Sequence, residues 1–215
     1  MNQLNEYFFK DELSAAQMDY LWAHGWRHFG EYFFRYSQVA AKHVTPLRID
    51  LAAFKLSTSL KRILKANTDL EVVIREAFID EEKEALFRRH KVRFTENVPD
   101  SIHDFLSPFP AQIPCETKEV CLLQNGKLIG VSFLDLGEDS TSSVYSIYEP
   151  EIQQRSLGIF LILNSIQHSL KLGKRYYYLG YAYREPSHYD YKKRFSGLEE
   201  FHWTNEWKKK GKSFD

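Results

Sequence analysis

Residues 143–181 read SVYSIYEPEIQQRSLGIFLILNSIQHSLKLGKRYYYLGY and decide the fold. An alternating, β-branched segment over 144–148 predicts a strand, and an apolar segment over 157–172 predicts a helix that Gly173 ends. A second strand of large aromatic residues follows over 175–181. A helix between two strands favours a right-handed crossover and a parallel strand pair. This stretch therefore predicts the centre of a mixed sheet.

Further strands are expected on both sides of this unit. Two lie over 117–124 and 127–136, joined by Asn125-Gly126, which is a strong hairpin signal. Gly137 to Ser142 is expected to be a polar turn, 189–195 a short helix, and 201–207 a last strand. This order of elements resembles the acyltransferase domain of the GNAT superfamily. We therefore predict an α+β fold, a GNAT-like domain with a mixed central sheet.

The first half predicts a smaller α/β domain packed on the GNAT-like one. Helices are expected over 14–24, where Ser14 and Gln17 form a capping box, and over 57–65 and 80–91. Strands are expected over 31–36, 44–54 and 70–78. Four prolines then fall within 95–114. We predict an N-terminal domain over 1–95, a linker over 96–114 and a catalytic domain over 115–215.

Composition bounds the class of protein. The chain has 215 residues, of which 43% are hydrophobic and 27% charged, as in ordinary globular proteins. Two cysteines, Cys115 and Cys121, are too few for a disulfide framework. No basic segment followed by an apolar one opens the chain, and the longest apolar run, 157–163, is too short to span a bilayer. These features predict a cytoplasmic protein without a membrane partner.

The net charge of zero conceals opposed blocks. Residues 27–65 hold eight basic and two acidic side chains, and 171–215 hold eleven and six. Residues 100–154 hold two basic and nine acidic side chains. Because a polyanion responds to the local field, zero net charge does not exclude a nucleic-acid partner. We predict that folding brings the two basic blocks onto one face and directs the acidic block elsewhere.

The loop before the central helix is the first candidate site. Arg155, Ser156 and Gly158 lead into a helix whose first N–H groups attract phosphate or carbonyl oxygen. The pattern resembles the R/Q-x-x-G-x-G/A loop by which GNAT enzymes hold the pyrophosphate of coenzyme A. Phe160 replaces the last small residue, and we expect its ring to crowd a pyrophosphate. An ordinary helix start with a structural glycine is the alternative interpretation.

Candidates for catalysis follow the next strand. Tyr181, after Gly180, is expected near the crevice at the carboxyl ends of the parallel strands, where a phenol donates hydrogen bonds to reacting oxygens. Asp190, Lys192 and Arg194 lie just beyond it. Basic residues at this place fit a nucleic-acid backbone or an acidic substrate, although a solvated helix face is the more common role.

A second basic segment lies upstream, with Arg48 on a strand and Ser59 and Arg62 on a helix that also carries Lys61 and Lys65. Serines at a helix start cap it and also bind phosphate. The eight histidines show no ligand spacing, and we expect no metal site.

Taken together, the segments resemble the arginyl-tRNA–protein transferase family, including its bacterial leucyl branch. The resemblance covers nearly the whole chain, and its strongest part lies within 144–195. It rests on an ordered set of short motifs: Gly25-Trp26-Arg27-x-Phe29-Gly30, Pro46-Leu47-Arg48, Ser57-x-Ser59-x-x-Arg62, Asn67-x-Asp69, Ser143-Val144-Tyr145, Arg155-Ser156-Leu157-Gly158, Tyr178-Leu179-Gly180-Tyr181 and Asp190-Tyr191-Lys192-x-x-Phe195. The family's cysteine cluster is missing, since 36–44 holds no cysteine.

The resemblance implies transfer of arginine or leucine from charged tRNA to the α-amine of a protein N-terminus, which we expect to be acidic. Partners are then charged tRNA and that protein, without DNA, and no cofactor is needed besides the aminoacyl-tRNA.

The resemblance also implies site roles. Arg155, Ser156 and Gly158 are expected near the aminoacyl or 3′-end site. Tyr181 is expected to bond the reacting groups, and Asp190 to orient the amine or Lys192. The residues expected on tRNA phosphates or the acidic terminus are Lys192, Arg194, Arg48, Ser59 and Arg62.

Two other functions stay open. One is a GNAT-type N-acetyltransferase that uses acetyl-CoA, and the other is a non-catalytic relative that binds tRNA or protein.

Overall fold

The computed structural model describes residues 4–94 and 98–210. These described residues form four α-helices: α1 (Ala15–Ala23), α2 (Thr58–Ala66), α3 (Glu81–His90) and α4 (Leu157–Lys171). Four short 3₁₀ segments accompany them: η1 (Lys91–Arg93), η2 (Ile102–Asp104), η3 (Pro150–Arg155) and η4 (Asp190–Arg194). The strands are β1 (Asn5–Phe9), β2 (Arg27–Phe29), β3 (Tyr32–Tyr36), β4 (Gln38–Val39), β5 (Lys42–Asp50), β6 (Glu71–Glu76), β7 (Thr117–Gln124), β8 (Lys127–Leu136), β9 (Ser140–Tyr148), β10 (Tyr176–Tyr183), β11 (Leu198–His202) and β12 (Glu206–Lys209).

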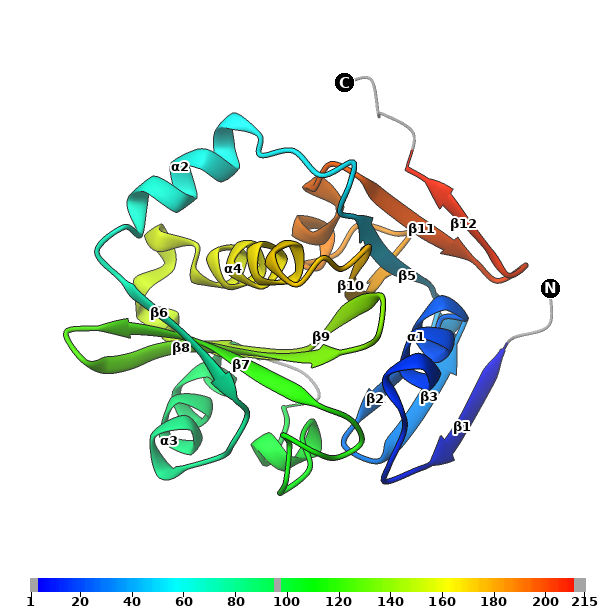
Figure 1. Cartoon of the computed structure of the whole chain (residues 1–215), viewed down its shortest axis with the longest axis horizontal. Helices are drawn as coiled ribbons and strands as arrows, with labels where there is room; N and C mark the ends of the chain where they lie inside the picture. Colours follow the sequence, from blue (N-terminus) through cyan, green and yellow to red (C-terminus); the bar gives the residue numbers. More distant parts are fainter. Residues whose placement is uncertain (1–3, 95–97, 211–215) are drawn as a thin grey trace.

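A nine-stranded mixed sheet forms the centre of the molecule (Figure 1). Its order is β12-β11-β5-β10-β9-β8-β7-β6, with β4 paired to β5. The pair β9–β10 is parallel and is joined through α4, as the sequence predicts. This mixed α/β architecture has the GNAT-like form expected of residues 143–181. Strands β5 and β6 come from the predicted N-terminal domain, so the predicted boundary at 96–114 does not coincide with a division of the sheet.

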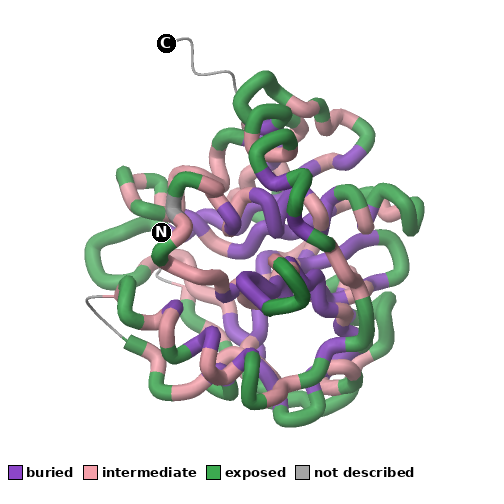
Figure 2. Tube along the Cα trace, turned by 90° about the vertical axis from the view of Figure 1, so that its left-hand side faces the viewer, coloured by how far each residue is buried: buried purple, intermediate pink, exposed green. Residues whose placement is uncertain are grey.

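Helices cover both faces of this sheet (Figure 1). Helix α4 packs on one face, where Leu161 and Ile166 are fully buried, and α2 contacts α4. Helix α3 packs on the other face through Leu86 and Phe87, against Phe133 of β8. The buried parts of the chain accordingly lie in the interior of the molecule, with exposed turns around them (Figure 2).

The N-terminal segment adds a second, smaller sheet in the order β1-β3-β2, with α1 packed against it. The predicted capping box is confirmed, since Ser14 accepts a hydrogen bond from the N–H of Gln17 and the Gln17 side chain accepts one from Ser14. Met18 and Trp22 of α1 bury against Phe33 of β3. These contacts fix one face of the small sheet.

Two local predictions were wrong. Residues 140–142, expected in a turn, are strand, because they pair with β8 on one side and β10 on the other. The single strand expected over 201–207 is a hairpin of β11 and β12, whose turn includes Asn205 at φ 64°. The strand at 140–142 is stabilised by pairing with β10, which is distant in sequence. In the hairpin, the turn between β11 and β12 was not recognised.

The charge blocks occupy opposite ends of the sheet. Strand β5, from the first basic block, lies between β10 and β11 of the second. The acidic block supplies β7, β8 and β9. The strands of the two basic blocks are therefore neighbours in the sheet, whereas Arg27 and Arg48 of the first block are buried and add no charge to the surface. That the two blocks share one face stays a prediction. Among the described residues, no helix is long and apolar enough to cross a membrane.

Candidate functional site

The central sheet opens between β9 and β10. Their parallel pairing covers only Ser140–Ser142 against Tyr176–Tyr178, and each strand continues beyond it. Strand β10 also shifts register against β5 between Tyr178 and Gly180, where Gly180 takes φ +83°. Residues with a Cβ rarely adopt a positive φ, which explains why a glycine occupies this position in β10. We call this divergence of β9 and β10 the split.

Two cations meet at the split. Lys192 Nζ donates a hydrogen bond to the carbonyl of Tyr181 at 3.0 Å, and it lies 3.5 Å from where a Cβ on Gly180 would be. Arg27 Nε lies 3.7 Å from the same point. Burial, and to a lesser degree the charge of Arg27, lower the pKa of Lys192 to about 7. Near neutral pH this amine therefore exchanges protons readily, which suits acid–base chemistry.

Arg27 reaches the split from β2. It is buried, and its guanidinium donates to Ser142 Oγ and to the carbonyl of Ser143, at the point where the parallel pairing ends. Burial lowers its pKa, while Asp135 opposes this shift. Asp135 itself accepts hydrogen bonds from His28 at 2.6 Å and Thr117 at 2.7 Å. A fixed positive charge thus lies at the split.

Tyr181 points from β10 toward the N-terminal segment. Its hydroxyl donates to the carbonyl of Gly25 at 2.7 Å, and its ring contacts Phe34 and Tyr36. Burial raises the pKa of this phenol, so it stays protonated. In this structure the hydroxyl ties β10 to the chain just before β2, and thereby positions Arg27.

The loop before α4 is held from outside the GNAT-like half. Arg155 forms a two-pronged ion pair with Asp69 at 2.9 and 3.0 Å, which lowers the pKa of that carboxyl. The buried Asn67 donates to the carbonyl of Arg155 at 2.9 Å. Ser156 precedes α4 at φ 52°, without a side-chain cap. Two motifs 86 residues apart in the chain therefore form one clamp on this loop.

Gly158 lies under an aromatic ring. A Cβ at this position would be 2.9 Å from Tyr148 Cε1, so only glycine admits Tyr148 here. Arg93 donates a hydrogen bond to the Tyr148 hydroxyl. The expectation that Phe160 crowds the helix terminus was wrong, because its ring is buried in the core with Leu157 and Leu161. The residue that covers the first turn is Tyr148.

The other predicted residues lie in two places. Asp190 accepts a hydrogen bond from Lys193 at 2.7 Å, which lowers its pKa. It does not orient Lys192, because residues three apart lie on the same side of a 3₁₀ turn and residues two apart do not. Arg194 is exposed beside them.

Arg48 is buried in an ion pair with Glu199 at 2.8 Å and stacks on Tyr176 at 3.8 Å. Ser59 and Arg62 are exposed on α2. The structure thus places Lys192 at the split, whereas Arg48 has the surroundings of a structural ion pair.

Comparison with known proteins places these features in a family. A model of the arginine-tRNA–protein transferase C terminus matches residues 82–202. The aspartate/glutamate leucyltransferase of Leptospira interrogans is 31% identical over 198 residues, which cover 90% of this chain and 77% of that protein. The enzyme of the same name from Marinobacter nauticus is 28% identical and covers 85% of this chain and 79% of that protein. The chain belongs to the arginine-tRNA–protein transferase family. It is therefore an aminoacyltransferase.

The fold of this transferase also matches a solved structure. FemX superposes with a TM-score of 0.53 at 10% identity, over 85% of this chain and 65% of that chain. Identity this low supports the shared fold alone.

One residue of the transferase site was not predicted. Arg27 belongs to the Gly25-Trp26-Arg27 motif, yet no site role was assigned to it from the sequence. The available signals were the motif itself and its place at the start of the first basic block.

Proposed function

We propose that this transferase moves leucine from leucyl-tRNA to the α-amine of proteins that begin with aspartate or glutamate. The observation that carries this proposal is the meeting of Lys192 and Arg27 at the split between β9 and β10. The names of the relatives support the amino acid and the acidic acceptor. An acidic first residue is attracted to the fixed charge of the buried Arg27, because opposite charges interact more strongly in a protein interior than in bulk water.

The same cations favour leucine over arginine. An arginyl side chain at the split would be repelled by Arg27, and also by Lys192 once that amine has taken up a proton. Asp135, whose charge opposes the lowering of the Arg27 pKa, already accepts hydrogen bonds from His28 and Thr117 and does not bind an arginyl group in addition. A neutral leucyl group avoids this repulsion.

The reaction needs a proton acceptor and a group that stabilises an oxyanion. Neutral Lys192 takes a proton from the acceptor's α-ammonium, whose ordinary pKa is about 8. The free amine attacks the ester carbon, a C–N bond forms, and the carbonyl oxygen becomes an oxyanion that Arg27 stabilises. The nitrogen, which becomes positively charged on attack, loses its second proton to water. The C–O bond to the ribose then breaks, and the ribose oxygen receives the proton from Lys192. One proton is released to solvent for each amide bond formed, and no covalent enzyme intermediate is needed.

The exposed Arg62 and Arg194 are placed to contact tRNA phosphates in this proposal. Coenzyme A is the weaker alternative, since Tyr148 covers the first turn of α4, where its pyrophosphate would bind. The cytoplasm, where charged tRNA is made, is the corresponding location.

A transfer assay tests the proposal. Purified protein is incubated with leucyl- or arginyl-tRNA, each labelled on the amino acid, and with peptides that begin with Asp, Glu or Ala. We expect leucine on the Asp and Glu peptides, and none on Ala peptides or on peptides with an acetylated N-terminus. Transfer of arginine alone, or of neither amino acid, would overturn it.

A further inference from the structure

One face of the small N-terminal sheet is covered with aromatic rings. The register of β1 and β3 places Tyr7 opposite Phe34 and Phe9 opposite Tyr32, and alternation puts all four on the same face. Tyr7, Phe9 and Tyr32 are 65%, 68% and 39% exposed. Neighbouring large rings left open to solvent mark an interaction surface. We call this the aromatic face.

The rings of the aromatic face form a row that leads to the split. Ring centroids are 5.2 Å apart for Phe9 and Tyr32, and 5.6 Å apart for Tyr32 and Phe34. Phe34 stacks on Tyr36 at 5.6 Å, and Tyr36 contacts Tyr181 of β10 at 5.2 Å. The row therefore runs from an exposed edge strand to one wall of the split.

A branch of the row reaches the other wall. Phe29 of β2 contacts Phe34 at 5.1 Å and Phe105 at 4.9 Å. Phe105 stacks on Tyr145 of β9 at 3.8 Å. The aromatic face is thus continuous with both strands that enclose the split.

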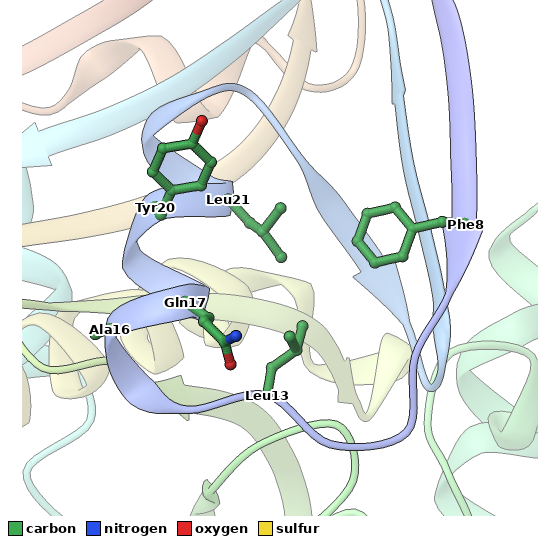
Figure 3. Close-up of a pocket in the computed structure, with 6 residues that line it drawn as sticks. All are labelled: Phe8, Leu13, Ala16, Gln17, Tyr20 and Leu21. Atoms are coloured by element: carbon green, nitrogen blue, oxygen red, sulfur yellow. The ribbon is translucent and has the colours of Figure 1, made fainter.

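The opposite face of the small sheet is not available. Phe8 and Phe33 point toward α1, and Figure 3 shows Phe8, Leu13 and Leu21 directed into the space between α1 and β1. Only the aromatic face is left open on this sheet.

The chemistry of the aromatic face fits unpaired nucleotides. In the described strands β1, β2 and β3, its positions hold aromatic rings, Asn5 and Arg27, and neither an aliphatic side chain nor a carboxylate. Such rings stack on any base, and the cations Arg27 and Lys192 at the inner end suit a phosphate backbone. Protein interfaces are also rich in aromatic side chains, so the choice of nucleotides rests on the continuity of the aromatic face with the split, where the transferred ester is proposed to lie.

We infer that the aromatic face binds the unpaired nucleotides at the 3′ end of the charged tRNA. This inference rests on the proposed function, because it takes the ester at the 3′ terminus to lie in the split. The terminal nucleotide then lies beside Arg27, and the preceding bases stack outward along Tyr36, Tyr32 and Phe9. Stacking of the unpaired bases on the aromatic face then positions the ester at the 3′ terminus beside Lys192.

Binding of uncharged leucine tRNA, labelled at its 5′ end and followed by fluorescence anisotropy, tests the inference. We expect Phe9→Ala and Tyr32→Ala to raise Kd about fivefold or more, and Phe9→Trp to preserve it. The same variants should not change Kd for a tRNA shortened by its unpaired 3′ nucleotides. Tyr20→Ala is the matched control, since Tyr20 is 62% exposed but lies on α1, on the opposite side of the sheet. Circular dichroism melts verify folding.

Unchanged Kd in both alanine variants overturns the inference, whether or not transfer occurs. So does a loss of acidic-peptide binding with normal tRNA binding, or a change of oligomeric state in light scattering. A wild type that binds tRNA through this face yet transfers no amino acid sinks the proposed function and leaves the inference standing.

Discussion

At the scale of the residue, Lys192 is the group whose surroundings differ most from those of its type on a surface. Its amine donates a hydrogen bond to the carbonyl of Tyr181, but burial and, to a lesser degree, the charge of Arg27 disfavour the charged form. A pKa of about 7 means that the proton leaves Lys192 in the range where most lysines remain charged. Loss of that proton creates the base that the reaction needs.

Replacing Lys192 should change how transfer depends on pH. In the wild type, single-turnover transfer should rise through pH 7 as Lys192 loses its proton. In Lys192→Arg the guanidinium stays charged, so the rate should fall about 100-fold, and the remaining rise should move toward pH 8 with the peptide's own amine. Stopped reactions between pH 5.5 and 9 measure both effects.

A variant of the neighbouring Arg27 tests independently whether the titration near pH 7 belongs to Lys192. Arg27→Met removes the charge that contributes to lowering the pKa of Lys192, so the rise in rate should shift to higher pH in this variant. An identical rise near pH 7 in wild type and Lys192→Arg would assign the titration to another group.

The sequence singled out a site residue when that residue lay in a recognisable motif. It did not predict contacts between residues that only folding brings together. Lys192 lies in a motif after the second strand, and the sequence singled it out. Arg27, the other cation at the split, lies 165 positions earlier in the chain. Its hydrogen bond to Ser142 depends on how distant segments pack, and the local sequence around either residue does not predict that packing. Arg48 shows the reverse case, since a basic side chain on a strand gives no sign of the Glu199 that pairs with it.

At the scale of the element, the start of α4 depends on the turn between α2 and β6. Asn67 ends α2 and donates both to the carbonyl of Ile63 and to that of Arg155, each at 2.9 Å. One buried amide therefore closes one helix and holds the loop that begins another. Asp69 adds the ion pair to Arg155 on the surface.

Truncating Asn67 should loosen this junction. Asn67→Ala leaves two carbonyl oxygens without their donor, and we expect it to lower the free energy of unfolding by about 2 kcal/mol. Thr68→Ala, at the exposed neighbour that bonds only Lys65, should stay within about 0.5 kcal/mol of the wild type. Urea denaturation followed by tryptophan fluorescence measures both; equal values for the two variants would contradict a clamp at Asn67.

Elements with strong local signals were predicted well. The capping box fixed the start of α1, and Asn125-Gly126 fixed the β7–β8 hairpin. Strand β1 and the β11–β12 hairpin were missed or merged, because their partners, not their local pattern, stabilise them.

At the scale of the whole molecule, the order of strands separates the charge. The basic blocks supply β12, β11, β5 and β10, and the acidic block supplies most of the other half of the sheet. This separation needs both halves of the chain. Strands β5 and β6 both come from the N-terminal half, but β5 pairs among the basic strands and β6 pairs at the far edge of the sheet, beside β7. A tRNA approaching the split therefore meets unlike fields on its two sides.

Paired charge removals at the two ends should separate these sides. Lys61→Ser with Arg62→Ser removes two exposed cations of α2, near the basic blocks, and should reduce the slope of log Kd against log salt for tRNA by up to about two. Arg88→Ser with Lys127→Ser removes two exposed cations from α3 and the start of β8, near the acidic block, and should leave the slope unchanged. Both variants lose the same net charge, so a general electrostatic effect would lower both slopes equally. A reduced slope only in the second variant would place the tRNA on the acidic side, where the phosphates of its acceptor arm would not lead toward Arg27 and Lys192.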